Sequence, residues 1–399
     1  MSRKLLSSQN RNKVYLLSAA HLLHDIYTSF LSTLLPLLIE KFALTYTLAG
    51  LMRVMMRVPS LINPLIGELA DKKGMKIFVV ISPALTAVAM SLIGCVPGYY
   101  GVLALLFVTG ISSSLFHVPV PVVLKKLSAK RLGFGMSLFQ IGGEISRTAG
   151  PLIIIGAVSL WGMSGIWRLM PAGVMMSVFL YYRLKNFNFP GAENGNNASN
   201  EHSLIYTLRQ GKSVFAATSG LMLTKSLTAS VIVTFLPTYL VSQGKSFASA
   251  GAALAALQAA AVAGVLFAGI VSDRIGRKHL LLALTFFAPV SVLLFLFLGL
   301  KFTLPCVIIM GFTAFSSTPV ILAMIQEEGF DYPSVANGVY MTLNFLMTSV
   351  IVLLFGKLAD ITGLKEAFYL AAFLSFAGFG LFVIFSKKMQ KTVFPLSLE

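Results

Sequence analysis

Polar and charged side chains recur along one helical face of a stretch that is otherwise apolar. His21, Asp25, Thr28 and Ser32 follow spacings of four, three and four residues, which place them on one side of an α-helix. If such a stretch crosses a bilayer, each ionisable group costs about 2.5 kcal/mol or more on insertion scales. Groups retained at that cost are typical of ion and substrate pathways, so this face is a candidate functional surface.

Two further apolar stretches carry the same pattern. Arg53 and Arg57 share a predicted helical face with Ser60, and Glu144 and Arg147 share one with Gln140. A carboxylate inside a membrane can take up and release a proton, so Asp25 and Glu144 are the candidate proton carriers. A guanidinium is a planar fork that binds carboxylate or phosphonate through two parallel hydrogen bonds. The candidate anion contacts are Arg53, Arg57, Arg147 and Lys225, with polar support from His117, Gln140 and Asn344.

Each of these groups also has a simpler interpretation. Glu144 and Arg147 are three residues apart and could neutralise each other. Asp25 could pair permanently with one of the cations, and His21 and His24 could be packing residues. The balance of charge still favours a ligand, because four cations stand against two carboxylates in these stretches. An anionic substrate would complete that balance.

The composition indicates what holds these faces. Hydrophobic residues make up 56% of the 399 residues and charged residues 11%, well below the roughly 25% charge of soluble domains. Apolar runs such as "LLLALTFFAPVSVLLFLFLGL" are long enough to cross a bilayer as helices. The sequence therefore predicts an all-α integral membrane protein. It shows no nucleotide-binding loop, no metal-ligand cluster and no soluble catalytic domain, so we expect no enzyme activity, no cofactor and no metal.

Apolar runs and polar breaks predict twelve transmembrane helices in two pseudo-symmetric six-helix halves. The halves are residues 1–184 and 212–399, and the polar, Asn- and Gly-rich stretch 185–211 between them is a predicted cytoplasmic linker. Most Lys and Arg fall in loops on one side, which predicts that both termini are cytoplasmic in an inner membrane. The net charge of +17 follows from this bias, so we expect contact with membrane lipids and none with nucleic acid.

A short basic segment occurs twice. Residues 67–76 read "GELADKKGMK" and residues 269–278 read "GIVSDRIGRK", with Gly, Asp, Gly and Lys at the same offsets. Each copy falls in a predicted cytoplasmic loop, after the second helix of its half. Duplicated halves of this kind are typical of transporters that rock around a binding site near the midplane of the membrane.

Both copies resemble the signature loop of the major facilitator superfamily. More narrowly, residues 21–52 and 136–152 are similar to fosmidomycin-resistance-type exporters. The resemblance implies that the loops form a latch on the cytoplasmic side. The latch residues would be Gly67, Asp71, Lys72 and Gly74 in the first copy, and Asp273, Arg274, Gly276 and Arg277 in the second.

The resemblance and the polar faces together predict a proton-coupled secondary active transporter that works by alternating access. We expect an antiporter that exports a small anionic organic compound, such as a drug or a metal chelator. The alternative is a proton-coupled symporter that takes up an organic anion or a metal chelate, because a cationic cavity fits both. We expect the protein to act as a monomer, with protons and a small molecule as its partners.

Overall fold

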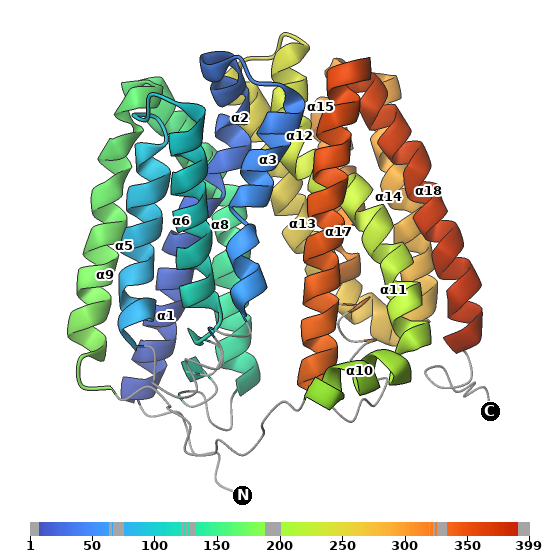
Figure 1. The fold of residues 1–399 in the computed structure, drawn as a ribbon, viewed down its shortest axis with the longest axis horizontal. Helices are drawn as coiled ribbons and strands as arrows, with labels where there is room; N and C mark the ends of the chain where they lie inside the picture. The colour runs from blue at the N-terminus through green and yellow to red at the C-terminus, as the bar shows by residue number, and fades with distance from the viewer. Residues whose placement is uncertain are drawn as a thin grey trace, which may run out of the picture. The chain divides into compact units, whose positions relative to one another are not determined.

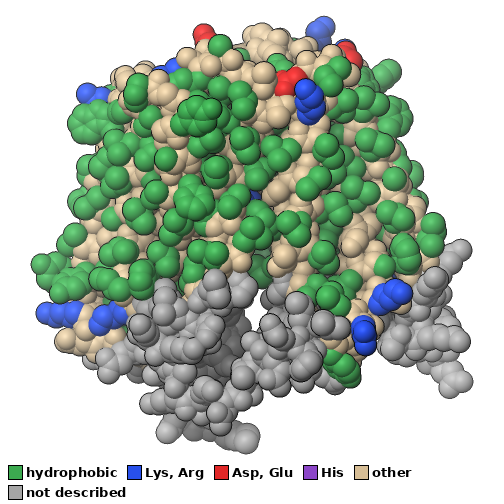
Figure 2. Space-filling model, viewed as in Figure 1, with side chains coloured by type: hydrophobic (Ala, Val, Ile, Leu, Met, Phe, Trp, Pro, Cys, Tyr) green, Lys and Arg blue, Asp and Glu red, His purple; other side chains and the backbone are tan. Residues whose placement is uncertain are grey.

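The computed structural model describes residues 8–63, 66, 76–120, 123–124, 127, 132–187, 201–318, 320–321, 324 and 333–389. Every regular element among these residues is a helix, and they include no strand (Figure 1). Hydrophobic side chains cover most of the helix surfaces in view, and the visible Lys and Arg gather near the helix ends (Figure 2). An all-helical chain with apolar outer surfaces is expected where lipid surrounds it, because every backbone polar group must be satisfied within the chain.

Eight of the described helical segments are long and apolar enough to cross a membrane, so the chain is a multi-pass membrane protein. Two shorter apolar helices, Lys76–Leu92 and Leu300–Phe315, accompany them. The predicted total of twelve spans includes stretches outside the described residues. The eight segments are Asn10–Phe42, Tyr99–His117, Met163–Leu184, Lys212–Ser242, Phe247–Ala268, Arg277–Leu298, Val339–Thr362 and Leu364–Ser386.

The chain divides into two compact units. Unit 1 comprises Met1–Ala43 and Met52–Asn197, and unit 2 comprises Leu44–Leu51 and Ala198–Glu399. Helix α10 (Glu201–Gln210) lies in the stretch 185–211 for which the sequence predicts a linker, so that stretch is partly helical.

Unit 1 is built around helix α1, which packs against α8, α5 and α9, while α5 also packs against α6. Apolar residues of α1, α5, α6, α8 and α9 form a shared core that includes Leu17, Phe116 and Phe139. The described elements of this unit are α1 (Ser8–Thr28), α2 (Phe30–Phe42), α3 (Tyr46–Met55, shared with unit 2), η1 (Val58–Ile62), α5 (Lys76–Leu92), α6 (Tyr99–His117), α8 (Leu132–Trp161), η3 (Met163–Leu169) and α9 (Met170–Leu184).

In unit 2, α11 packs along α18 and α13 along α15, and these are the most extensive helix contacts among the described elements. Helix α14 packs against both α15 and α18. Besides α10, the described elements are α11 (Lys212–Lys225), the π-helical turn η4 (Ser226–Ser230), α12 (Val231–Ser242), α13 (Phe247–Ile275), α14 (Arg277–Leu298), η5 (Leu300–Phe302), α15 (Thr303–Phe315), α17 (Pro333–Thr362) and α18 (Leu364–Met389).

A carboxylate on α17 holds the first residues of α3, which belong to unit 2. Asp360 accepts hydrogen bonds from the backbone N–H groups of Tyr46 at 2.5 Å and Thr47 at 3.0 Å, and from the Thr47 hydroxyl. Gly356 allows this approach, because a Cβ there would lie 2.6 Å from the Tyr46 carbonyl oxygen. Asp360 therefore caps α3 across a sequence separation of more than 300 residues, where the helix dipole favours a negative charge.

We predict that Asp360→Ala frees the start of α3. Loss of a capping carboxylate should cost about 1–2 kcal/mol locally, because two backbone donors lose their acceptor. Hydrogen exchange followed by mass spectrometry should show faster exchange at Tyr46 and Thr47. Thr362→Ala is the control, because the Thr362 hydroxyl donates only to the nearby carbonyls of Leu358 and Gly363. Unchanged exchange at Tyr46 and Thr47 in Asp360→Ala would reject the cap.

Candidate functional site

Asp25 lies in unit 1 within contact of three imidazole rings. Its carboxylate oxygens are 2.9 Å from His24 Nδ1, 3.2 Å from His21 Nε2 and 3.4 Å from His117 Nε2. His21 is one helical turn before Asp25 on α1, and His117 comes from the end of α6. We call His21, His24, Asp25 and His117 the histidine–aspartate cluster.

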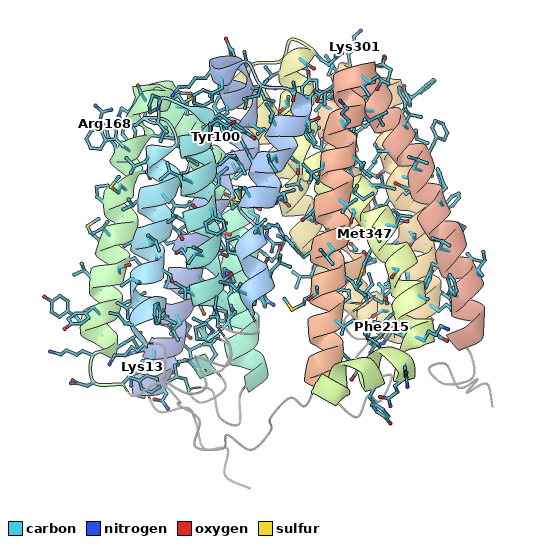
Figure 3. All side chains as sticks on the ribbon, in the orientation of Figure 1. Lys13, Tyr100, Arg168, Phe215, Lys301 and Met347 are labelled. Carbon is cyan, nitrogen blue, oxygen red and sulfur yellow. The ribbon has the colours of Figure 1, made fainter. Side chains whose placement is uncertain are left out.

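The depth of the cluster follows from its place on α1. Lys13, near one end of α1, and Arg168, in η3, lie at opposite ends of unit 1 (Figure 3). Asp25 is twelve residues beyond Lys13, which is about 18 Å along a helix. A hydrocarbon core is about 30 Å thick, so the cluster lies near its middle.

Backbone carbonyls fix the orientation of two of the rings. His21 Nδ1 lies 2.7 Å from the Phe139 carbonyl, and His117 Nδ1 lies 2.9 Å from the Ser113 carbonyl. A carbonyl oxygen can only accept, so both rings carry hydrogen on Nδ1. Their Nε2 atoms then face each other at 3.1 Å beside the Asp25 carboxylate. Two imidazole nitrogens and the Asp25 carboxylate therefore meet as three hydrogen-bond acceptors. This arrangement is stable only when a proton or another cation lies between them.

The third ring is fixed by a chain of hydroxyl groups. Ser112 donates to the Ser82 carbonyl at 2.8 Å, and Thr86 donates to Ser112 at 2.7 Å. Because this chain ends on a carbonyl, Thr86 Oγ1 accepts from His24 Nε2 at 2.9 Å. His24 Nδ1 then faces Asp25 Oδ1 at 2.9 Å, and that contact requires a proton on one of the two atoms.

Glycines on α8 allow that helix to lie against the cluster. A Cβ at Gly143 would come within 2.6 Å of the His21 ring, and one at Gly142 within 2.7 Å of the Ser18 carbonyl oxygen. A Cβ at Gly150 would likewise come too close to α1, 2.8 Å from the Ile26 carbonyl oxygen. Close approach lets Phe139 stack on the His21 ring, with 3.8 Å between centroids.

The second candidate proton carrier has a different environment. Glu144 accepts from Arg147 Nη1 at 3.0 Å and 3.1 Å through its two oxygens, so the local ion pair considered from the sequence is formed. The side chains of Glu144 and Arg147 are 24% and 48% exposed, respectively. Gln140, on the same helix, is exposed. This carboxylate is therefore paired with a cation in the structure.

Arg53 and Arg57 do not share one continuous helical face as the sequence predicts. Helix α3 ends at Met55, and Arg57 lies in the turn before η1. Pro59 explains the break, since it has no N–H to bond to the carbonyl of Met55, four residues earlier, and its ring would clash with that carbonyl in a continuous helix. The two arginines are nevertheless close enough to act electrostatically on each other, and both are in range of Arg147. Among the described residues, neither arginine forms an ion pair with a carboxylate.

The remaining predicted residues lie elsewhere. Lys225 is the last residue of α11, directly before the π-helical turn, and Asn344 is half-buried on α17. Gly276, between α13 and α14, has a φ of +85°, which favours glycine, and Arg274 and Arg277 flank it. Gly67, Asp71, Lys72 and Gly74 lie outside the described residues, as does the side chain of Asp273.

Sequence reasoning missed several residues that hold the histidine–aspartate cluster in place. Thr86 and Ser112 gave no signal of their own, and Gly143 was noticed only as part of the stretch 136–152 that resembles exporters. The predicted absence of a metal-ligand cluster also differs from the structure, which brings possible ligand atoms of His21, Asp25 and His117 within 4.8 Å of one another. The spacing of His21 and Asp25 by four residues was the available signal.

Polar groups midway along apolar helices of a multi-pass chain, as the described residues show, are typical of membrane proteins that move ions or substrates. The sequence profile of the Major Facilitator Superfamily matches residues 17–352. The chain therefore belongs to this superfamily, whose members are membrane transporters and not enzymes.

Two relatives are similar along almost their whole length. The fosmidomycin resistance protein of Escherichia coli (strain K12) is 26% identical over 367 residues, which cover 91% of this chain and 90% of the relative. The uncharacterized MFS-type transporter YfnC of Bacillus subtilis (strain 168) is 24% identical over 397 residues, covering 92% and 91%. The resemblance expected from the sequence is confirmed.

Solved structures show the same fold. A bacterial homolog of the human lysosomal transporter Spinster, in an inward-facing and unoccupied conformation, matches with a TM-score of 0.79 and 12% identity, covering 98% of this chain and all of that one. The D-xylose–proton symporter matches with a TM-score of 0.73 and 14% identity, covering 96% and 97%.

We predict that Gly143→Ala disturbs the cluster. The added methyl group must displace the His21 ring or move α8, so transport should fall by about tenfold or more, since a misplacement of about 1 Å can cost 100-fold. Gly156→Ala, on the same helix, is the matched control, because a Cβ there meets nothing within 4 Å. Transport assays in proteoliposomes with equal amounts of inserted protein give the comparison. Equal loss in both variants would show a general effect on α8 and none on the cluster.

Proposed function

We propose that this protein is a proton-coupled secondary active transporter that exports a small anionic organic compound, such as a drug or a metal chelator, across the inner membrane. The observation that carries the proposal is the contact between Asp25 Oδ1 and His24 Nδ1, which requires a proton near the middle of the membrane. Efflux is supported by the similarity to the fosmidomycin resistance protein. We further propose that both termini are cytoplasmic and that the monomer is the working unit.

The proton site consists of Asp25 and the imidazoles around it. The cluster is buried except on the His117 side, where that side chain is 35% exposed. A proton can therefore enter and leave from one direction while the other contacts of Asp25 stay in place. Glu144 is the second candidate carrier, and its ion pair with Arg147 would have to open before it could act.

The anion site is formed by the arginines of unit 1. Glu144 compensates Arg147, whereas Arg53 and Arg57 repel each other and form no close ion pair with a carboxylate among the described residues, although Asp25 attracts Arg57 from a greater distance. An anionic substrate would offset that repulsion. His117 and Gln140 are proposed polar contacts in unit 1, and Lys225 and Asn344 are proposed substrate contacts of unit 2. The two signature loops with Asp71 and Asp273 are the proposed cytoplasmic latch.

The second candidate function is proton-coupled uptake of an organic anion or metal chelate. Its support is that the arginines would bind an incoming anion as well as an outgoing one. Assays in everted and right-side-out vesicles separate the two. Proton-driven accumulation only in everted vesicles indicates export from the cell, and accumulation only in right-side-out vesicles indicates uptake.

We predict that Asp25→Asn abolishes proton-driven accumulation but spares substrate exchange, since the amide keeps the shape and cannot carry the proton. Glu144→Gln should retain part of the coupled activity, because its carboxylate is held by Arg147. Both rates are measured in proteoliposomes with and without a pH gradient. If Asp25→Asn and Glu144→Gln both retain full proton-driven accumulation, the coupling assignment is wrong.

Arg57 is the residue we expect to contact the anion most directly. Arg57→Lys should weaken substrate binding although the charge is kept, because an ammonium cannot form the paired hydrogen bonds of a guanidinium. Arg57→Ala should weaken binding further, by about 10- to 100-fold in total, which corresponds to roughly 1.4–2.8 kcal/mol. Titration calorimetry with the transported compound gives the affinities. A cationic substrate, or an Arg57→Ala protein that binds like the parent, contradicts the anion site.

A further inference from the structure

We infer that His21, Asp25 and His117 form a binding site for one divalent transition-metal ion of the zinc type. This site goes beyond the proposed transport function, because metal binding to the resting protein depends neither on the direction of transport nor on the substrate. The donors are two imidazole Nε2 atoms and one carboxylate oxygen. Imidazole favours zinc and its neighbours in the periodic table, whereas calcium and magnesium favour oxygen donors alone.

The distances between the donor atoms fit one tetrahedral ion. Two ligand atoms bound to the same zinc at about 2.0–2.1 Å lie about 3.3–3.4 Å apart in a tetrahedron. His21 Nε2 lies 3.1 Å from His117 Nε2 and 3.2 Å from Asp25 Oδ2, and His117 Nε2 lies 3.4 Å from Asp25 Oδ1. The His21–His117 and His21–Asp25 separations match two edges of one face of a coordination tetrahedron. The contact of His117 is to the other oxygen of Asp25, so the carboxylate has to turn before one oxygen serves an ion held by both rings.

Backbone carbonyls hold the two histidine ligands in the tautomer that can bind a metal through Nε2. Metal-binding histidines usually donate their second ring N–H to a carbonyl or carboxylate. His21 donates to the Phe139 carbonyl and His117 to the Ser113 carbonyl, so each Nε2 presents its lone pair to the site. His24 lies against Oδ1 of Asp25, which leaves Oδ2 for the ion.

The site has a closed side and an open side. The side chains of His21 and Asp25 are 4% and 13% exposed, whereas that of His117 is 35% exposed. The Phe139 ring, stacked on His21, and Phe116, stacked on His24 with 5.0 Å between centroids, cover the closed side. Three protein ligands and an exposed side leave a fourth coordination position for water or a substrate donor atom, as in open zinc sites.

The metal site overlaps one part of the proposed proton site, the place where His21 Nε2, His117 Nε2 and Asp25 converge, and it leaves the contact between His24 Nδ1 and Asp25 Oδ1 in place. A metal ion would occupy the space where the three acceptors otherwise require a proton, so binding of zinc and of that proton should exclude each other. The metal proposal can therefore be tested on the purified full-length protein in detergent, without a substrate and without a pH gradient.

The experiment measures Zn²⁺ binding by titration calorimetry on protein carrying no polyhistidine tag, and Co²⁺ binding by its visible absorption. We expect one Zn²⁺ per chain and the intense absorption of tetrahedral Co²⁺. His117→Gln and His21→Gln should each weaken Zn²⁺ binding by about 100-fold or more, since loss of an outer-shell group alone costs about 10- to 100-fold. His279→Gln is the control, because His279 is exposed on α14.

His117→Gln is the decisive variant, because the partial exposure of His117 allows substitution without disruption of the core; size-exclusion profile and Tm confirm its fold. Unchanged Zn²⁺ affinity in folded His117→Gln and His21→Gln overturns the metal site. So does failure of the parent protein to bind Zn²⁺ or Co²⁺. If Asp25→Asn still abolishes proton-driven accumulation in that case, the three acceptors hold protons only, and the transport proposal stands while the metal proposal fails.

Discussion

The packing of unit 1 depends on one carboxylate, that of Asp25, which lies in the middle of a membrane-spanning helix. Left uncompensated, Asp25 would be costly at that depth. Its compensation comes from α1 itself, through His21 and His24, and from α6, through His117. Helix α5 holds the His24 ring through Thr86. The charge of Asp25 therefore constrains the side chains where α1 contacts the neighbouring helices. Each histidine ring that contacts Asp25 needs a hydrogen-bond partner of its own.

The helices can meet these demands only by close packing. Between helices in a membrane, small residues allow backbones to approach, because lipid offers little hydrophobic drive for association. Gly142, Gly143 and Gly150 put α8 directly against α1. That approach brings the Phe139 carbonyl to the His21 ring, and the carbonyl decides which ring nitrogen faces Asp25. Backbone packing therefore sets the chemistry of the cluster as much as its titratable side chains do.

The sequence predicted the features that follow from composition and local periodicity. These include the helical membrane fold, the superfamily, and the polar face of α1 with Asp25. The pairing of Glu144 with Arg147 was an open alternative to the roles of proton carrier and anion contact. The sequence did not predict the role of His24, because Thr86 and Ser112 fix that ring from helices 62 or more residues away. It also placed Arg57 on a continuous helix, because periodicity gave more weight to the arginines than to Pro59. The capping of α3 by Asp360 depends on a contact between residues more than 300 positions apart, which no local pattern reveals.

The contrast between Asp25 and the more exposed Glu144 shows why one of these two carboxylates is suited to sense an ion. Glu144 is paired with the guanidinium of Arg147, which stays charged under all physiological conditions. The charge of its partner therefore does not change with pH. Asp25 is satisfied by imidazoles, whose ring nitrogens either donate or accept according to their own protonation. Removal of one proton, or arrival of one cation, therefore changes several hydrogen bonds of the cluster together. Those bonds reach α5 through Thr86 and α8 through the Phe139 carbonyl, so the occupancy of a single site acts on the packing of the helices around it.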